Sequence, residues 1–262
     1  METLSLFSEL EDELGQLEQS APAQLWNAAS IDDAAIAQRA KDIVPGLDYI
    51  HDFITRDEEL DLVRQIDKMD WSNHWQRRTQ YYGRRYLPDE SDASYTPIIG
   101  GRGAANAIRN AKQATRDRRL AAQTGVVDHL PWWAIRFRDR LVDQGIFEHA
   151  PNQMGINEYL PGQGIAAHVD YHGGEVVSIT LITGCVMDFE RVDAEGASVD
   201  LFDRPTLASA WLPPRSMVVL KGEARTRWTH GIARRKKDIV DGRVIPRGRR
   251  ISVTFRWIDN GR

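Results

Sequence analysis

Residues 157–172 read NEYLPGQGIAAHVDYH, a stretch in which two short strands meet at a Pro-Gly turn. Every second side chain of a β-strand points to the same face, so His168 and Asp170 share one face, with His172 two positions further on. Two imidazoles and a carboxylate on one surface have two explanations. Either that face is simply wetted by solvent, or it forms a ligand site.

The strand pattern continues to the end of the chain. Short apolar or alternating segments are separated by Pro, Gly and Asp turns, with no helix expected between them. The expected strands are QMGINEYL, IAAHVD, EVVSITLI, CVMDFE, SVDLFD, ASAWL, SMVVLKG and RISVTFRWI. Eight closely spaced strands predict a sandwich or a jelly-roll barrel.

The front of the chain is helical instead. GLDYIHDFIT has strand-like alternation, and Thr55 with Glu58 forms a capping box for a helix over 56–69. A second helix is expected at 131–145, and a polar one near 104–122. Residues 1–44 are an acidic leader, and 45–262 form one domain. The predicted fold class is therefore α+β, mainly β, with N-terminal helices packed on a sandwich or jelly-roll barrel.

Composition limits the functional classes. One cysteine excludes an internal disulfide and favours a reducing, cytoplasmic compartment. No apolar run approaches the roughly 20 residues that span a bilayer, so no membrane association is expected. The chain is also expected to be a monomer. Charge is segregated: residues 1–75 carry −12, whereas 76–119 carry +6 and 225–256 carry +9. These two basic segments favour a polyanionic partner, although solvated surfaces explain them equally well.

A third histidine completes a candidate metal site. His230 lies in RWTHGIARR, far along the chain from His168 and Asp170. Two imidazoles and one carboxylate on a shared face, with open positions, are typical of non-haem Fe(II) oxygenases. A His-x-Asp pair alone is common by chance. The assignment of a metal site therefore needs support from other parts of the sequence.

That support comes from the last strand, RISVTFRW. Arg250, Ser252, Thr254 and Arg256 share one face, opposite an apolar face. Such a polar face usually lies in water. Alternatively it lines the barrel, where guanidinium groups would bind a short dicarboxylate. The alternation of the 153–160 strand places Asn157 and Tyr159 together as two more donors.

Taken in order, these residues resemble the AlkB family of Fe(II)- and 2-oxoglutarate-dependent dioxygenases. The shared pattern is Asn-x-Tyr, His-x-Asp, a distal His and Arg-x5-Arg, and the resemblance covers about 45–258. It implies a double-stranded β-helix, Fe(II) bound by His168, Asp170 and His230, and dioxygen as the oxidant. It also implies that 2-oxoglutarate is bound by Asn157, Tyr159, Arg250, Ser252 and Arg256.

Some features resemble the branch that contains the tRNA wobble-uridine hydroxylases. These are GLDYIHDFIT, PPRSMVVLKGEARTRWTHGI and RRISVTFRW. In the DNA-repair members, the second residue after the metal-binding Asp is acidic and reads an exocyclic amine. Here that residue is His172, so the resemblance implies that His172 faces a different substrate.

Residues 71–86, WSNHWQRRTQYYGRRY, interleave aromatic residues with arginines. Together with the long polar excursion that follows, 71–125 is the expected substrate lid. Arginines can hold phosphates, and an aromatic ring can stack on an extruded base. Aromatics in the core and arginines on the surface are the alternative. The candidate substrate contacts are Trp71, Trp75, Arg77, Tyr82 and Arg84, with Tyr81 and Tyr86 as further stacking candidates.

Three functions fit this pattern. The first is oxidative demethylation or hydroxylation of a modified base in RNA or DNA. The second keeps the oxygenase chemistry but acts on a protein side chain or a small metabolite. The third, a non-catalytic barrel, is disfavoured by the complete set of three metal ligands and two arginines.

Overall fold

The computed structural model describes residues 31–73, 77–84, 129–170, 174–192 and 208–258. The described strands form two main antiparallel sheets. The larger sheet has the order β1 (Leu47–Ile50), β8 (Met217–Leu220), β5 (Val176–Leu181), β12 (Arg250–Arg256), β3 (Gln153–Tyr159) and β2 (Thr79–Gly83). The smaller sheet has the order β4 (Ile165–His168), β9 (Trp228–Ile232), β6 (Cys185–Arg191) and β7 (Ala208–Leu212).

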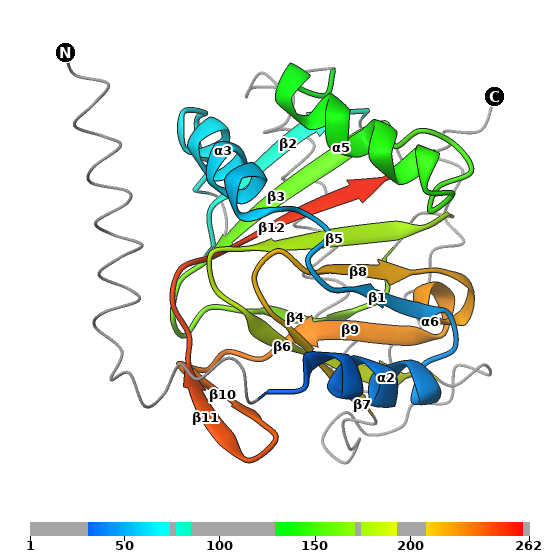
Figure 1. Cartoon of the computed structure of the whole chain (residues 1–262), viewed down its shortest axis with the longest axis vertical. Coiled ribbons are helices and arrows are strands. Elements are labelled where there is room, and N and C mark those ends of the chain that lie inside the picture. Colours follow the sequence, from blue (N-terminus) through cyan, green and yellow to red (C-terminus); the bar gives the residue numbers. More distant parts are fainter. Residues whose placement is uncertain (1–30, 74–76, 85–128, 171–173, 193–207, 259–262) are drawn as a thin grey trace, which may run out of the picture.

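The two sheets face each other and enclose a core (Figure 1). From β3 to β6 each successive strand changes sheet, and the chain crosses again from β7 to β8 and from β8 to β9. Val218 and Leu220 of the larger sheet pack with Met187 and Phe189 of the smaller one. This winding is the predicted jelly roll, or double-stranded β-helix.

Strand β12 lies inside the larger sheet, and its alternating side chains form one apolar face and one polar face. It pairs with β3 on one side and β5 on the other. Ile251, Val253 and Phe255 point away from the smaller sheet into an apolar cluster. The alternate side chains Ser252 and Thr254 are only 4% and 7% exposed. The polar face therefore lines the barrel and is not wetted by bulk solvent.

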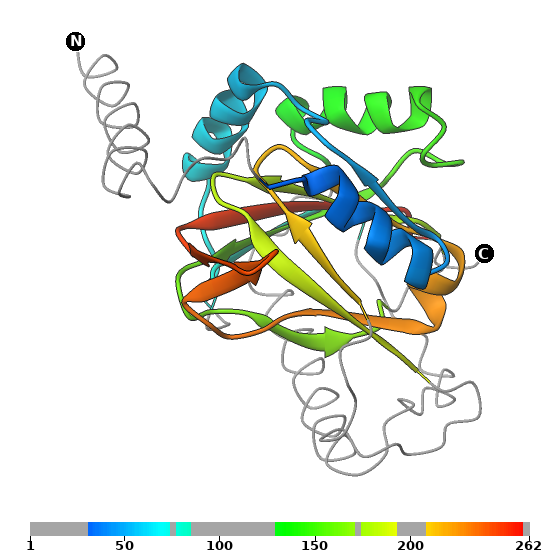
Figure 2. The same ribbon diagram turned by 60° about the horizontal axis from the view of Figure 1, so that its bottom comes forward.

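Two helices cover the outer face of the larger sheet, as Figure 2 shows from a second direction. They are α3 (Arg56–Asp67) and α5 (Trp132–Asp143). Leu62, Val63 and Ile66 of α3, and Phe137 and Leu141 of α5, bury their side chains in the same cluster as the outward residues of β12.

The ends of these helices follow from local sequence. The capping box of Thr55 and Glu58 is confirmed, and Glu58 also pairs with Arg140 of α5, which holds the two helices together. Helix α5 ends before Gly145, whose φ of +66° few other residues adopt cheaply.

A helix also forms within the stretch that the sequence assigned to the leader. Helix α2 (Asp33–Ile43) buries Ile36, Ala37 and Ala40 and packs against β7 and β1. Its apolar residues recur at helical spacing, so the end of the 1–44 segment joins the core of the domain.

Two smaller elements complete the described chain: helix α6 (Gly222–Thr226), which links β8 to β9, and the hairpin of β10 (Lys237–Val240) and β11 (Arg243–Pro246).

Other predictions fall outside the described residues: the helix near 104–122, the SVDLFD strand and most of the proposed 71–125 lid. Within the described part of the chain, none of the helices has the length and apolar character needed to cross a membrane.

Candidate active site

The three predicted metal ligands come together between the sheets. His168 ends β4, and His230 lies directly opposite it on β9, while Asp170 follows β4 by two residues. The Nε2 atoms of His168 and His230 lie 3.9 and 3.6 Å from the carboxylate oxygens of Asp170. One ligand atom from each of the three residues lies within 4.8 Å of the other two. Among the described residues, these three form the one group with metal-ligand spacing.

A glycine allows the two metal-binding strands to approach each other. A Cβ on Gly231 would lie 2.9 Å from the backbone of Ala167, closer than real atoms pack. Hydrogen bonding then fixes the first ligand, because Nδ1 of His168 lies 2.9 Å from the carbonyl oxygen of Ala166. With Nδ1 donating to that carbonyl, the Nε2 lone pair of His168 faces the carboxylate and is free for a metal.

The electrostatics of the group favour binding of a cation. Burial, and then the neighbouring His168, lower the pKa of His230 to about 3, so its ring is neutral near pH 7. Burial alone would raise the pKa of Asp170. Arg256, whose Nη2 lies 3.2 Å from Asp170 Oδ1, and the adjacent imidazoles hold that pKa well below its usual value instead. The site therefore offers two imidazoles and one carboxylate, the set expected for Fe(II).

The candidate cosubstrate residues lie beside this group. Arg250 is 3% exposed, donates from Nη2 to Thr180 Oγ1 at 2.9 Å and places its guanidinium 5.3 Å from the centroid of the Tyr159 ring. Its Nε and Nη1 have no hydrogen-bond partner among the described residues. A buried guanidinium with two unmet donors is suited to a carboxylate. The far end of 2-oxoglutarate fits this position.

The second pair of cosubstrate candidates lies on the neighbouring strand. Asn157 stands opposite Ser252 in the β3–β12 register, and both belong to the barrel face. Nε of Arg77 donates to Asn157 Oδ1 at 2.9 Å, and the Arg77 guanidinium lies 5.9 Å from the Tyr159 ring centroid. Arg77 was predicted to contact substrate phosphates. In the structure it contacts the cosubstrate candidates Asn157 and Tyr159.

Strand register orders these groups along the barrel. Near one end, Tyr159 packs with Cys185 and Ile232, beside Arg250. His230 precedes Ile232 by two residues on β9, so the metal group lies further along. Arg256, at the far end of β12, reaches Asp170. The metal group therefore separates the Arg250 end from the Arg256 end.

Strand β2 corrects one predicted substrate residue. Tyr82 is 4% exposed, donates to Gln80 Oε1 and packs edge-on to Trp133 in the helix-covered core. It therefore lies on the wrong face of the sheet to meet a substrate at the metal group. Its neighbour Tyr81 is 46% exposed on the barrel face, because successive strand residues point to opposite faces.

The remaining substrate candidates are placed less favourably, or not at all. Trp71 packs against the helix-side core, with the Arg78 guanidinium 4.9 Å from its ring centroid. Arg84 follows β2, where its backbone N–H donates to Asn152 O. Trp75, Tyr86 and His172 lie outside the described residues.

Sequence reasoning did not single out two further residues. Thr180 repeats the polar alternation of β12, because Ser178 and Thr180 interrupt an apolar strand. Arg225 donates from Nη1 to the carbonyl oxygen of Asp170, although the sequence marks it only as one member of a basic run.

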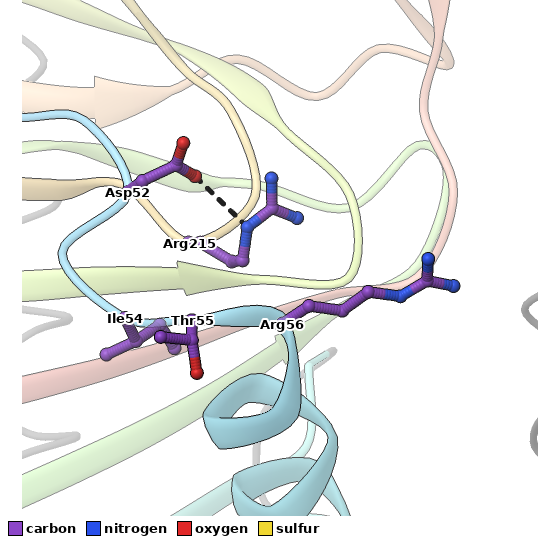
Figure 3. Close-up of a pocket in the computed structure, with 5 residues that line it drawn as sticks. All are labelled: Asp52, Ile54, Thr55, Arg56 and Arg215. Carbon is purple, nitrogen blue, oxygen red and sulfur yellow. Dashed lines mark hydrogen bonds and ion pairs between the residues drawn. The ribbon is translucent and has the colours of Figure 1, made fainter.

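A separate surface hollow lies away from the metal group (Figure 3). The β1–α3 connection and the β7–β8 turn form it; they contribute Asp52, Ile54, Thr55, Arg56 and Arg215. Arg215 is already paired there with Asp52 and Glu59. None of the metal group or the cosubstrate candidates lines this hollow.

Comparison with known proteins identifies the family. Residues 46–256 match the model of the 2OG-Fe(II) oxygenase superfamily. An uncharacterized protein, L905, of Acanthamoeba polyphaga mimivirus is 29% identical, over 84% of this chain and 87% of that protein. The tRNA (carboxymethyluridine(34)-5-O)-methyltransferase ALKBH8 of Macaca fascicularis is also 29% identical, over 84% of this chain. The alkylated DNA repair protein ALKBH8 homolog of Arabidopsis thaliana is 28% identical, over 83%.

The match covers different shares of these relatives. It spans 31% of the length of the macaque protein and 59% of the Arabidopsis protein. The cofactors of the superfamily are Fe(II), 2-oxoglutarate and dioxygen, and the His-Asp-His group fits the iron. The chain belongs to the 2OG-Fe(II) oxygenase superfamily, and within it to the AlkB family of dioxygenases.

Proposed function

We propose that this AlkB-type dioxygenase demethylates or hydroxylates a modified base in nucleic acid. The observation that carries the proposal is the position of Tyr81. Its ring and the guanidinium of Arg256 meet above Gly155: a Cβ at that glycine would lie 3.4 Å from Tyr81 Cε1 and 3.5 Å from Arg256 Nη1. An exposed ring next to the metal carboxylate is a suitable stacking surface for an extruded base.

The relatives support the same substrate class. Two of them are named for tRNA modification and for repair of alkylated DNA, and a zebrafish relative, 24% identical over 83% of this chain, is named a probable RNA/DNA demethylase. His172, outside the described residues, stands where the DNA-repair members carry an acidic residue. Within the proposal, we therefore favour a modified uridine in RNA over methylated adenine or cytosine.

The residues of the chain have separate tasks in this reaction. Iron with 2-oxoglutarate and dioxygen supplies an oxidant strong enough to hydroxylate a C–H bond. Arg250 and Thr180 hold the far carboxylate of the cosubstrate, and Asn157, positioned by Arg77, contacts its other end. Arg256 keeps Asp170 ionised. Tyr81 orients the base.

The test is release of succinate that depends on iron and substrate. Wild-type protein is given 2-oxoglutarate with matched RNA and DNA oligonucleotides, each modified or unmodified. We expect modified RNA to stimulate succinate release above the substrate-free rate, and binding to weaken steeply with salt. If no oligonucleotide stimulates turnover and binding does not respond to salt, the nucleic-acid proposal is wrong, and a protein or metabolite substrate becomes the better candidate.

A further inference from the structure

Arg225 lies on α6, the short helix that carries the chain from the larger to the smaller sheet just before the strand that bears His230. It is 4% exposed, although α6 also contains solvent-exposed residues. Arg227, two residues further on, is exposed to solvent. The chain therefore turns one arginine of this segment into the barrel and the other away from it.

The buried guanidinium is only partly satisfied. Its Nη1 donates to the main-chain oxygen of Asp170, while Nε and Nη2 have no hydrogen-bond partner among the described residues. Leaving a buried charged donor unmet is costly, and burial lowers the pKa of Arg225 accordingly. An apolar side chain of similar size would suit the fold better. The arrangement is explained if a ligand accepts from these two donors.

The local charge identifies the kind of ligand. Arg225, Arg250 and Arg256 bring three positive charges to the barrel interior, and the carboxylate that Arg225 and Arg256 both face is Asp170. Fe(II) and the doubly charged 2-oxoglutarate neutralise each other when both bind. An excess of positive charge therefore remains in the loaded site, and an anion would balance it.

The position of Arg225 separates it from the site assigned to the far carboxylate of the cosubstrate. The candidates for its far carboxylate, Arg250 and the neighbouring Tyr159, lie together at one end of the barrel, whereas the candidate Arg256 lies on Asp170. Arg225 contacts Asp170 and lies close to Arg256, on the opposite side of the metal group. This is the side on which Tyr81 is exposed, where the proposed function places the substrate.

Resting on that proposed function, we propose that Arg225 binds an anionic oxygen group of the substrate, next to the carbon that is oxidised. The shared chemistry is that of an oxyanion, either a carboxylate carried by the modified base or the phosphate beside it. Arg225 would then select substrates by charge. Tyr81 would recognise them only by their flat ring.

The first experiment needs no nucleic acid. The protein loaded with Fe(II) and 2-oxoglutarate is titrated without oxygen, at constant ionic strength, with acetate and with inorganic phosphate; binding is followed by the visible absorption of the iron–2-oxoglutarate complex. We compare wild type with Arg225→Met, Arg225→Lys and the exposed control Arg227→Met. We expect Arg225→Met to weaken anion binding at least tenfold, Arg225→Lys to retain part of it, and Arg227→Met to match wild type.

A second arm identifies the source of the anion. Three otherwise identical RNA hairpins carry, at one uridine, a carboxymethyl group, its methyl ester or a methyl group. If Arg225 binds a base carboxylate, Arg225→Met weakens binding of the carboxymethyl hairpin only. If Arg225 binds a phosphate, the substitution weakens binding of all three hairpins equally and leaves binding of the corresponding nucleosides, which lack the phosphate, unchanged.

Two results would overturn the assignment. One is equal anion affinity in wild type and Arg225→Met. The other is loss of bound iron from Arg225→Met, because Arg225 would then serve only to hold Asp170. Absence of RNA binding in every variant, with the small-anion difference intact, would refute the nucleic-acid substrate and leave the anion site standing.

Discussion

Replacing Arg250 by methionine should weaken 2-oxoglutarate binding strongly and change the stability of the apo protein little. The side chain is buried and keeps two donors, Nε and Nη1, without partners among the described residues. Hydrogen bonds between charged groups contribute about 1.5–3 kcal/mol each. Loss of two such bonds to a carboxylate amounts to roughly 3–6 kcal/mol, or about 10²- to 10⁴-fold in the dissociation constant of 2-oxoglutarate.

The protein without cosubstrate should respond differently. Methionine removes the two unmet donors, a change that is neutral or stabilising by about 1–4 kcal/mol in buried sites. The lost contacts to Thr180 and to the Tyr159 ring offset part of that gain, by about 2 kcal/mol. We therefore expect the free energy of unfolding to change by no more than about 2 kcal/mol in either direction.

The measurements are urea unfolding of the apo protein and titration of the iron-loaded protein with 2-oxoglutarate. Arg250→Lys should be intermediate in affinity, because it keeps the charge but loses the fork geometry. Arg243→Met, on the exposed hairpin, should match wild type in both assays. A variant Arg250→Met that binds 2-oxoglutarate normally, or that loses more than about 2 kcal/mol of stability, would refute the reasoning.

Three further predictions follow from the same geometry. Arg77→Met should raise the KM for 2-oxoglutarate several-fold and change kcat little, because Arg77 orients a residue that contacts the cosubstrate; steady-state kinetics check this. Tyr81→Ala should lower turnover of the nucleic-acid substrate without changing Tm, whereas Tyr82→Ala should cost about 3–5 kcal/mol of stability, as measured by thermal and urea unfolding. Glu158→Gln should destabilise the protein by about 1–3 kcal/mol near pH 7, and this difference should shrink as the pH falls below about 4.5, as measured by urea unfolding across pH.

The sign of the Glu158 prediction follows from its surroundings. Burial alone would raise the pKa of Glu158, but hydrogen bonds from Arg78 and Arg249 hold it below its usual value. A depressed carboxyl pKa stabilises the fold above the unfolded pKa, and this contribution is lost as the pH falls through the folded one. A Glu158→Gln difference that stays constant from pH 7 to pH 3 would contradict this account.

The metal and cosubstrate candidates could be predicted because strand alternation is local. His168 and Asp170 share a face by counting alone, and so do Arg250, Ser252 and Arg256. Their meeting in space required the distant His230 to pair with β4, which the order of the motifs indicated and the register confirms. Alternation also suggested that the polar face of β12 lines the barrel, although only its burial separates this from a wetted face.

Other features could not be predicted, for physical reasons. Alternation separates Tyr81 from Tyr82 but does not say which face of β2 meets the helices, and both faces carry a tyrosine. Arg225 belongs to no helical or strand repeat in the sequence, because it sits on a single helical turn that crosses between the sheets. The acidic character of the first 44 residues also masked the apolar spacing that packs α2 onto the barrel.

The central strands divide stability and function between their two faces. On β12, Ile251, Val253 and Phe255 bury apolar surface against the helices, and this burial is the main stabilising contribution of the strand. Because the outer face supplies the stability, the inner face can hold the unmet donors of Arg250 at a cost that a carboxylate then offsets. Truncating the outward residues should therefore lower Tm and leave the affinity of the surviving folded protein for 2-oxoglutarate intact. Truncating the inward residues should lower the affinity for 2-oxoglutarate and leave Tm nearly unchanged. An alanine scan of this one strand would therefore separate the two contributions position by position.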